Sequence, residues 1–467
     1  MREWEYFWHK WGQIMTKQEL EFRQGNIIKL LIRFSVPATL ASLTTIIYNI
    51  TDRYYIGKAV GRNGIAGIAT IFPLIMFLNA CGTLFAIGGG ALSGIYMGRQ
   101  EIDNARKVLG ASFFCLIVIG LTFTTFGTLF MKPIVLFLGA TENNIQYVID
   151  YCKYFFPSMT FQILILALCA FLRTDGQPML SMMTNFTSAF ANMILDYIWV
   201  VKMGYGMKGA ALATTISNII PGIFLIIYFL RGKLLRLELE KIKFDIKIIK
   251  EVLSIGISGF FNQSLNGVYA YSINTRLIKY GGELALAGMG IMTIVRNFLN
   301  TSYLGLNQGR QPILSYNWGA KNYRRVIKTF AYSMGMTIFL SIFLVLVIRF
   351  NSRSIASFFV NDDKELIDYT AKAIPIHLGM MMSTAIYLSC SNYFQAVGKG
   401  KLTTKLITLR LMILTIPLTY ILPIKWGVKG ILLSFPISDT IAAITASIVM
   451  TKEMRNVRRM MIEQEKK

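Results

Sequence analysis

Long apolar runs, interrupted by short polar or charged segments, extend through most of the chain. Many of them reach about 20 residues, which is the length that a helix needs to cross a bilayer. Lipid offers the backbone no hydrogen-bonding partner, so a crossing segment is either a helix or a strand of a closed barrel, and these runs are too long for barrel strands. The pattern therefore predicts an all-α, polytopic membrane protein with twelve transmembrane helices. They are expected at residues 27–56, 65–98, 105–131, 145–172, 179–201, 209–230, 248–279, 285–318, 326–350, 366–397, 402–422 and 428–450.

The first and second halves of this pattern repeat each other. Residues 65–69 (IAGIA) resemble 286–290 (LAGMG), residues 206–210 (GMKGA) resemble 427–431 (GVKGI), and residues 171–176 resemble 393–398. All three matches share an offset of about 221–222 residues, and internal repeats are typical of transporter folds. Six helices per repeat return the chain to its starting side, so we expect two pseudo-symmetric six-helix bundles in parallel.

This organisation divides the chain into five parts. A cytoplasmic N-terminal segment (1–28) precedes an N-lobe (29–231), a basic cytoplasmic linker (232–247), a C-lobe (248–452) and a cytoplasmic tail (453–467). In the first part, Trp4, Phe7, Trp8 and Trp11 recur at helical spacing between charged residues. This spacing fits either an amphipathic helix at the membrane interface or a disordered tail.

Composition and charge agree with the membrane assignment. The chain has 467 residues, of which 54% are hydrophobic and 15% charged, and its mean hydropathy is +0.51, whereas soluble domains carry about 25% charged residues. A net charge of +24 would suggest nucleic-acid binding in a soluble protein, but here Lys and Arg gather in alternate loops, as the positive-inside rule expects. We therefore expect a monomer in the cell membrane with both termini in the cytoplasm, and no nucleic-acid partner.

The sequence lacks the motifs of the main enzyme classes. The Gly-Lys pairs at 57–58 and 400–401 do not continue into a phosphate-binding loop, so the chain carries no recognisable ATP site. The five cysteines lie in predicted helices without paired spacing, and the two histidines, His9 and His377, are far apart. We therefore expect a protein that is not an enzyme and needs no cofactor.

Carboxylates inside the predicted helices are the main candidates for function, because a charge at membrane depth costs about 2.5–3.5 kcal/mol on insertion scales. Asp52 lies near the outer end of the first helix, Asp196 near the outer end of the fifth, and Thr214 at matching depth in the sixth. Asn192 lies one turn before Asp196 on the same helix face. Together these groups could hold a proton or Na⁺ between the carboxylates. The alternative is that Asp52 pairs with Arg53 or faces the outside water.

A further carboxylate, Asp439, lies near the middle of the twelfth helix, and Arg410 lies near the middle of the eleventh. Neighbouring antiparallel helices would bring them to similar depth, so a structural ion pair is expected. Arg296, in the eighth helix, has no evident partner and could line a water-filled cavity. By the repeat offset, positions 192 and 196 correspond to leucines at 414 and 418, so the acidic cluster belongs to the first half alone.

Several motifs, in order and spacing, resemble the multidrug and toxin extrusion (MATE) family, and within it the MepA-like bacterial branch. They are Asp52 followed by Gly57, NMILD at 192–196, GAALAT at 209–214 and QPILSYNWG at 311–319. No single motif is specific, but together they extend from Pro37 to about Met450, which is nearly the whole chain.

This resemblance implies export of amphipathic, often cationic, organic compounds in exchange for H⁺ or Na⁺, by alternating access of the two lobes. It implies that Asp52, Asn192, Asp196 and Thr214 form a cation site in the N-lobe and that Pro37 lets the first helix bend. The acidic residues that some family members carry in the seventh and tenth helices have no match here, so the N-lobe site is expected to act alone. Candidate residues of the substrate cavity are Tyr48, Tyr151, Tyr154, Phe155, Asn262, Tyr269 and Met292.

Two other functions remain open at this point. One is a lipid-linked oligosaccharide flippase of the same superfamily, for which Arg276 and Arg296 would be suitable cavity residues. The other is an exporter of narrow metabolite specificity. Efflux of a small cationic dye would distinguish both from a multidrug exporter.

Overall fold

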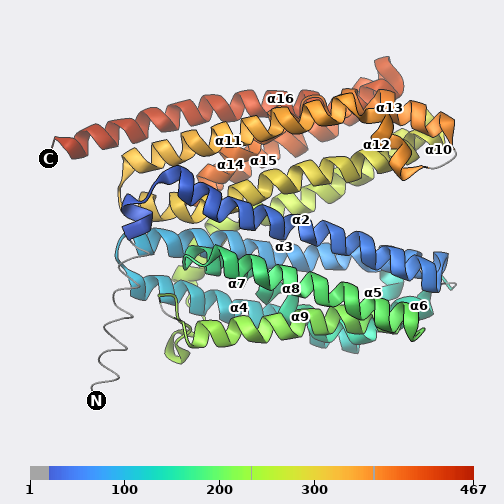
Figure 1. The fold of residues 1–467 in the computed structure, drawn as a ribbon, viewed down its shortest axis with the longest axis horizontal. Coiled ribbons are helices and arrows are strands. Elements are labelled where there is room, and N and C mark those ends of the chain that lie inside the picture. Colours follow the sequence, from blue (N-terminus) through green and yellow to red (C-terminus); the bar gives the residue numbers. More distant parts are fainter. Residues whose placement is uncertain (1–19, 143, 233, 361–362, 467) are drawn as a thin grey trace.

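The computed structural model describes residues 20–142, 144–232, 234–360 and 363–466. In these ranges the chain forms long helices that run side by side along the molecule (Figure 1). The predicted interfacial helix in residues 1–28 lies mostly outside the described residues. In the first half the helices are α2 (Ile27–Val60), α3 (Arg62–Gly98), α4 (Ile102–Leu129), α5 (Met131–Phe137), α6 (Ile145–Phe155), α7 (Met159–Thr174), α8 (Pro178–Asp196) and α9 (Gly206–Leu230). In the second half they are α10 (Ile246–Gly319), α11 (Tyr323–Phe350), α12 (Ser352–Phe359), α13 (Lys364–Leu378), α14 (Met381–Ala396), α15 (Gly400–Ile407) and α16 (Ile416–Glu465).

Short irregular helices complete the chain between these elements. Two are π-helical, η2 (Tyr197–Lys202) after α8 and η4 (Thr408–Thr415) between α15 and α16. Two are 3-10 helices, η1 (Phe156–Ser158) between α6 and α7 and η3 (Leu239–Lys241) in the linker. The described part of the chain contains no strand, which confirms the all-α fold class.

Eight helices in the described residues are long and apolar enough to cross a membrane, or nine if the bent pair α13–α14 is one span. Two of these segments are long enough for two crossings each, and both contain a glycine in the left-handed region, Gly282 (φ 63°) and Gly427 (φ 51°). Glycine is favoured there because it has no Cβ, so the chain can turn back without a loop. Divided at these glycines, and with α8 and η2 counted as one span, the helices follow the predicted order of twelve crossings.

The helices form two groups, which we call the N-lobe (α2–α9) and the C-lobe (α10–α16). Figure 1 shows α3–α9 on one side of the molecule and α11–α16 on the other, with α2 and α10 between them. Each lobe has its own hydrophobic core, and the N-lobe core extends to the first turns of α10. The start of α2, the end of α9 and the C-terminus lie at the same end of the bundle (Figure 1), so each lobe crosses an even number of times.

The lobes touch closely at that same end. A Cβ on Gly309 would lie 2.3 Å from Cα of Ser35, and a Cβ on Gly305 would lie 2.3 Å from Cα of Thr39. Real Cβ atoms essentially never approach this closely, so α2 and the second half of α10 meet backbone to backbone. The contact requires glycine at both positions of α10.

Residues 20–26 extend this contact across the lobes. The Phe22 ring stacks on Tyr316 with the centroids 5.2 Å apart, and the Phe22 carbonyl accepts a hydrogen bond from Asn317 at 3.2 Å. The Gly25 carbonyl accepts from Arg325 at 2.8 Å. The segment before α2 therefore holds the end of α10 and the start of α11, and it stabilises the closed end.

The linker between the lobes packs on the N-lobe. Asp175, at the end of α7, accepts hydrogen bonds from the Leu235 backbone N–H at 2.9 Å and from the Tyr228 hydroxyl at 2.7 Å. Arg106 of α4 forms an ion pair with Glu238 at 2.8 Å. These contacts hold the linker against the N-lobe. The limits of the linker, 232–247, remain a prediction.

Candidate functional site

Two carboxylates meet near the end of the N-lobe opposite the closed end. Asp52 lies two turns before the end of α2, and Asp196 is the last residue of α8 and fully buried. Their carboxyl groups lie within hydrogen-bonding reach of each other. One oxygen of each, Oδ1, is buried without a hydrogen-bonding partner among the described residues. We call Asp52 and Asp196 the acid pair.

Asn192 and Thr214 flank the acid pair on the inner side. The Asn192 amide nitrogen donates to Oδ2 of Asp196 at 3.2 Å, and its oxygen accepts from the Thr214 backbone N–H at 3.2 Å. This orientation gives each end of the amide a partner of the opposite kind. The Thr214 hydroxyl lies 3.4 Å from the same end of the amide. The structure thus brings together all four residues that the sequence suggested for a cation site.

Aromatic residues and an irregular helical turn surround the pair. Tyr48 lies one turn before Asp52 on α2, and buried Tyr151 of α6 lies within hydrogen-bonding reach of Thr214. Directly after Asp196 the helix widens into the π-helical η2, a feature that is often found at functional sites. Nothing in the sequence pattern indicated this widening.

Arg53, the neighbour of Asp52, is directed elsewhere. Its guanidinium lies over the Phe72 ring, 5.6 Å from the centroid. Within the described ranges no ion pair joins it to Asp52. The suggested Asp52–Arg53 pair is therefore absent from the described residues, and Asp52 has a second carboxylate, Asp196, within hydrogen-bonding reach.

A cavity of about 260 Å³ opens beside the acid pair. Asn192, Thr214 and Tyr48 belong to its wall, so the acid pair and the cavity share residues. Amide and hydroxyl side chains make up most of the remaining wall, which includes Gln263 of the C-lobe. The polar lining residues are Thr45, Tyr48, Asn79, Thr83, Gln162, Asn185, Ser188, Asn192, Thr214, Ser217, Asn218 and Gln263.

Most of this polar lining was not anticipated from the sequence. The signal was present, because Asn79, Gln162 and Asn185 are amides inside apolar runs, where an unpaired polar group is costly. Gln162 donates to Asn79 at 3.0 Å, which leaves the Gln162 oxygen without a partner in the described part of the chain. Such atoms are suited to hydrogen-bond a ligand or ordered water.

The seven residues suggested for a substrate cavity are not grouped together. Tyr48 lines the cavity, and Tyr151 lies beside the acid pair. Phe155, Tyr269 and Met292 are buried in the hydrophobic cores of the two lobes. The remaining two are half-buried and do not line this cavity, namely Tyr154 and Asn262.

In the C-lobe, Arg410 and Asp439 are in direct contact. Arg410 Nε donates to Oδ1 of Asp439 at 2.6 Å and Nη2 donates to Oδ2 at 3.0 Å. Thr384 donates a further hydrogen bond to Oδ2. Both members of the pair are buried. This carboxylate is therefore neutralised by a fixed cation, in contrast to the acid pair.

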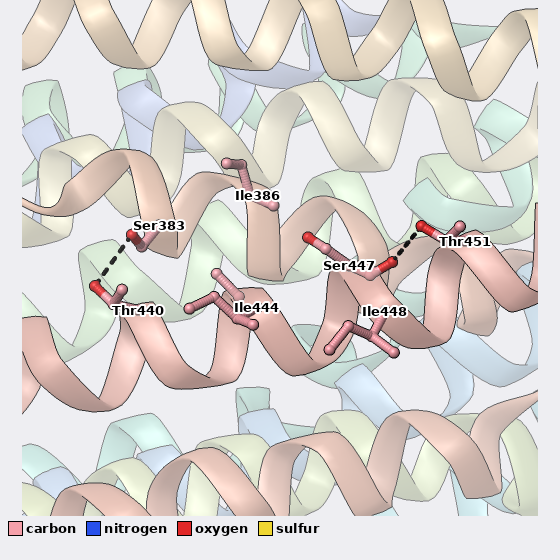
Figure 2. Close-up of a pocket in the computed structure, with 8 residues that line it drawn as sticks. Ser383, Ile386, Thr440, Ile444, Ser447, Ile448 and Thr451 are labelled. Atoms are coloured by element: carbon pink, nitrogen blue, oxygen red, sulfur yellow. Dashed lines mark hydrogen bonds between the residues drawn. The ribbon is translucent and has the colours of Figure 1, made fainter.

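A second, open groove of about 340 Å³ lies between α14 and α16 (Figure 2). Figure 2 shows Ser383 and Thr440 joined across it at 3.3 Å, and Thr451 bonded to the backbone of its own helix. Ile444 and Ile448 are exposed in its wall. Three of its four hydroxyls, those of Ser383, Thr440 and Thr451, form hydrogen bonds within the protein, and the described residues that line the groove include no charged side chain.

The acid pair can bind a cation for a simple electrostatic reason. Two carboxylates in hydrogen-bonding reach repel each other in a medium of low dielectric constant, and a proton or a small hard cation between them removes the repulsion. Carboxylate, amide and hydroxyl oxygens are also the ligands that hard cations prefer. The arrangement is therefore chemically suited to hold a proton or a small hard cation such as Na⁺.

The sequence matches known proteins over most of its length. The family model MatE matches residues 37–198 and 259–421, one segment in each lobe. The multidrug export protein MepA of Staphylococcus haemolyticus is 29% identical over 442 residues, which cover 93% of this chain and 95% of that protein. MepA of Staphylococcus aureus is 27% identical over 431 residues, which cover 92% and 94%.

Solved structures share the fold at lower sequence identity. A MATE crystal structure in complex with MaL6 matches with a TM-score of 0.89 and 18% identity, covering 94% of this chain and 99% of the other. A multidrug resistance MATE transporter in an outward-facing conformation matches with a TM-score of 0.88 and 19% identity, covering 94% and 98%. The two-lobed helical fold is thus a known transporter fold. Because the family model matches well over half of the chain, with one segment in each lobe, this protein belongs to the MatE family.

Proposed function

We propose that this protein exports varied, often cationic, organic compounds in exchange for H⁺ or Na⁺, by alternating access of its two lobes. The acid pair beside an amide-lined cavity is the observation that carries this proposal. The MepA relatives, which are named multidrug export proteins, support it. The cell membrane would be the site of action, with both termini in the cytoplasm.

Coupling would follow from a difference in cation affinity between two conformations. With the lobes packed at the cytoplasmic end, external H⁺ or Na⁺ reaches Asp52 and Asp196 and binds between them. The cation and the substrate would both contact Asn192 and Thr214, so binding of one disfavours binding of the other. Cation binding would therefore promote release of the substrate. Only such differential affinity lets an ion gradient drive export uphill.

One chain would be sufficient for this cycle, because a single chain contributes the acid pair and every residue of the cavity. We therefore propose the monomer as the transporting unit. No catalytic step and no bound cofactor is needed, since the gradient supplies the energy.

The test is ethidium efflux from cells or vesicles under a proton gradient or a sodium gradient imposed separately. Efflux should follow one gradient and be lost in Asp52→Asn and in Asp196→Asn. Asp368→Asn is the matched control, because Asp368 is an exposed carboxylate of α13 that pairs with Arg353 at 3.0 Å. Full efflux in both acid-pair variants would overturn the proposed coupling, and no efflux under either gradient would favour a flippase or a metabolite exporter.

A further inference from the structure

The C-lobe contains a cluster of charged and aromatic side chains around Phe435 of α16, in which Arg296 is half-buried and the other members are buried. The Arg296 guanidinium lies 4.7 Å from the centroid of the Phe435 ring and 5.3 Å from that of Tyr269. The Arg410 guanidinium lies 5.2 Å from the Phe435 centroid, and the His377 ring lies 5.7 Å from it. Two cations thus share one aromatic ring inside the membrane-spanning bundle.

The charges of this cluster do not balance. Asp439 is taken up by Arg410 through two hydrogen bonds and by Thr384 through a third. Arg296 forms no ion pair with any described residue, and its Nε and Nη1 atoms are buried without a hydrogen-bonding partner there. Nε2 of His377 is likewise buried and unpartnered in the described chain. The Arg296 guanidinium therefore lacks a counter-charge within the described ranges, and the three N–H groups on its Nε and Nη1 atoms are unpartnered there. The Tyr269 hydroxyl lies within hydrogen-bonding reach of this guanidinium.

The cluster occupies the C-lobe counterpart of the N-lobe cavity. Three residues that line the N-lobe cavity correspond, at the repeat offset of 221–222 residues, to the three members of the Asp439 network. The correspondences are Gln162 with Thr384 and Ser188 with Arg410 at an offset of 222, and Asn218 with Asp439 at 221, which is the offset of the match between 206–210 and 427–431. In the N-lobe the Ser188 hydroxyl bonds to the Ser217 carbonyl at 2.6 Å, where the C-lobe has an ion pair. The N-lobe thus has neutral polar side chains at the place where the C-lobe has a charged pair.

We propose that this cluster is a binding site for a monovalent anion of carboxylate size, held by Arg296. A guanidinium presents its donors as a planar fork that matches a carboxylate, and an anion would offset the cost of an unpaired charge at membrane depth. The rings of Tyr269 and Phe435 orient the guanidinium and exclude water from it. The anion could be a free ion or the carboxylate of an exported compound, and both use the same chemistry.

Binding of the free anion is tested on the purified full-length protein. Thermal unfolding is measured in sodium acetate and in a bulky sulfonate salt at equal sodium concentration. Acetate should raise the midpoint of the wild type, and this shift should disappear in Arg296→Gln. Arg276→Gln is the matched control, because Arg276 also stacks on an aromatic ring of the C-lobe, Tyr420, at 4.0 Å, but lies outside the cluster.

Arg296→Lys is a second variant for the case that Arg296→Gln does not fold. Because lysine keeps the positive charge, this variant should keep part of the acetate shift. An equal acetate shift in the wild type, Arg296→Gln and Arg276→Gln would overturn the proposal. So would the absence of any acetate shift in the wild type. Neither outcome depends on whether the protein exports dyes.

The source of the anion is tested by transport, and this arm rests on the proposed export function. A rhodamine with a free carboxylate is compared with its methyl ester, which lacks the negative charge. If Arg296 recognises the substrate, Arg296→Gln should lower the apparent affinity for the acid about tenfold, as expected for a lost charge-assisted hydrogen bond, and leave the ester unchanged. Equal export of both dyes by that variant, with the acetate shift lost, identifies a free anion. Failure of the wild type to export either dye contradicts the export function and leaves the acetate result standing.

Discussion

Asp196 and Asp439 are both fully buried carboxylates, but their partners differ. Asp439 is held by Arg410, a cation that cannot leave. Asp196 has the neutral amide of Asn192 and faces Asp52, so neutralising it requires a mobile ion. A buried charge has to be paired in either case. The same residue type is therefore structural in the C-lobe and suited to ion exchange in the N-lobe.

The structural role of the C-lobe pair predicts a specific pattern of stability. Arg410→Met should destabilise the protein by about 3–5 kcal/mol, because it leaves Asp439 buried without a counter-charge. The double variant Arg410→Met/Asp439→Leu should recover most of this loss, since it removes both charges. Thermal unfolding in detergent measures the two midpoints. Equal destabilisation in the single and double variants would contradict this prediction, because it would show that Arg410 does not stabilise the protein by compensating the charge of Asp439.

Helix α2 connects the closed end of the molecule to the acid pair. It is continuous from Ile27 to Val60 and contains the buried Pro37. Proline has no backbone N–H, so the carbonyl one turn earlier loses its helical partner and the helix bends more easily at this point. Ser35 and Thr39, on either side, are held against α10. A bend at Pro37 would therefore move Asp52 relative to a fixed base.

Replacing this proline should impair transport without unfolding the protein. Pro37→Ala restores the missing hydrogen bond and favours a straight α2, so we expect efflux to fall several-fold at unchanged expression. Pro73→Ala in α3 is the control, because Pro73 is also inside a long helix but is exposed. Efflux of Pro37→Ala and Pro73→Ala is measured with the same dye and gradient. Wild-type efflux in Pro37→Ala would remove the bend from the mechanism.

At the scale of the whole molecule, the lobes are in backbone contact at one end. The cavity beside the acid pair lies further along the bundle, lined by α2, α3, α7, α8 and α9 of the N-lobe and by α10 of the C-lobe. Residues 20–26 reinforce the closed end through Tyr316 and Asn317. Alternating access would require this contact to open and reform in each cycle. The glycines of α10 determine how closely it can form.

A larger residue at this contact should keep the molecule from closing. In Gly309→Leu the new side chain would collide with the backbone of Ser35. A cysteine introduced on α2 near residue 35 should therefore react faster with a water-soluble thiol reagent added on the side of the closed end. Gly290→Leu is the control on the same helix, because nothing lies within 4 Å of a Cβ there. Efflux should be lost only in Gly309→Leu. Equal labelling of the two variants would mean that the contact does not regulate access.

Single residues show how far sequence reasoning could reach. The sequence identifies Asp52 and Asp196 because a carboxylate is rare and costly within an apolar run. It adds Asn192 and Thr214 because they lie near these carboxylates on the same helix face or at matching depth. The sequence did not indicate the other amides of the cavity, such as Asn79, Gln162 and Asn185, because the direction of an amide side chain depends on the rotation of its helix. Met292 illustrates the converse error, since an apolar residue of suitable type is buried in the C-lobe core.

The sequence by itself determined the all-α polytopic fold class, the repeat of the two halves and the candidates for charge at membrane depth. These features depend on hydrophobicity and length, which are local properties of the chain. Only the tertiary structure decided that Asp52 meets Asp196 and not Arg53, that the lobes close through Gly305 and Gly309, and that Arg296 lacks a counter-charge. Each of these depends on how helices far apart in sequence rotate and pack against one another, and the apolar pattern of a helix buried on several sides leaves that rotation open.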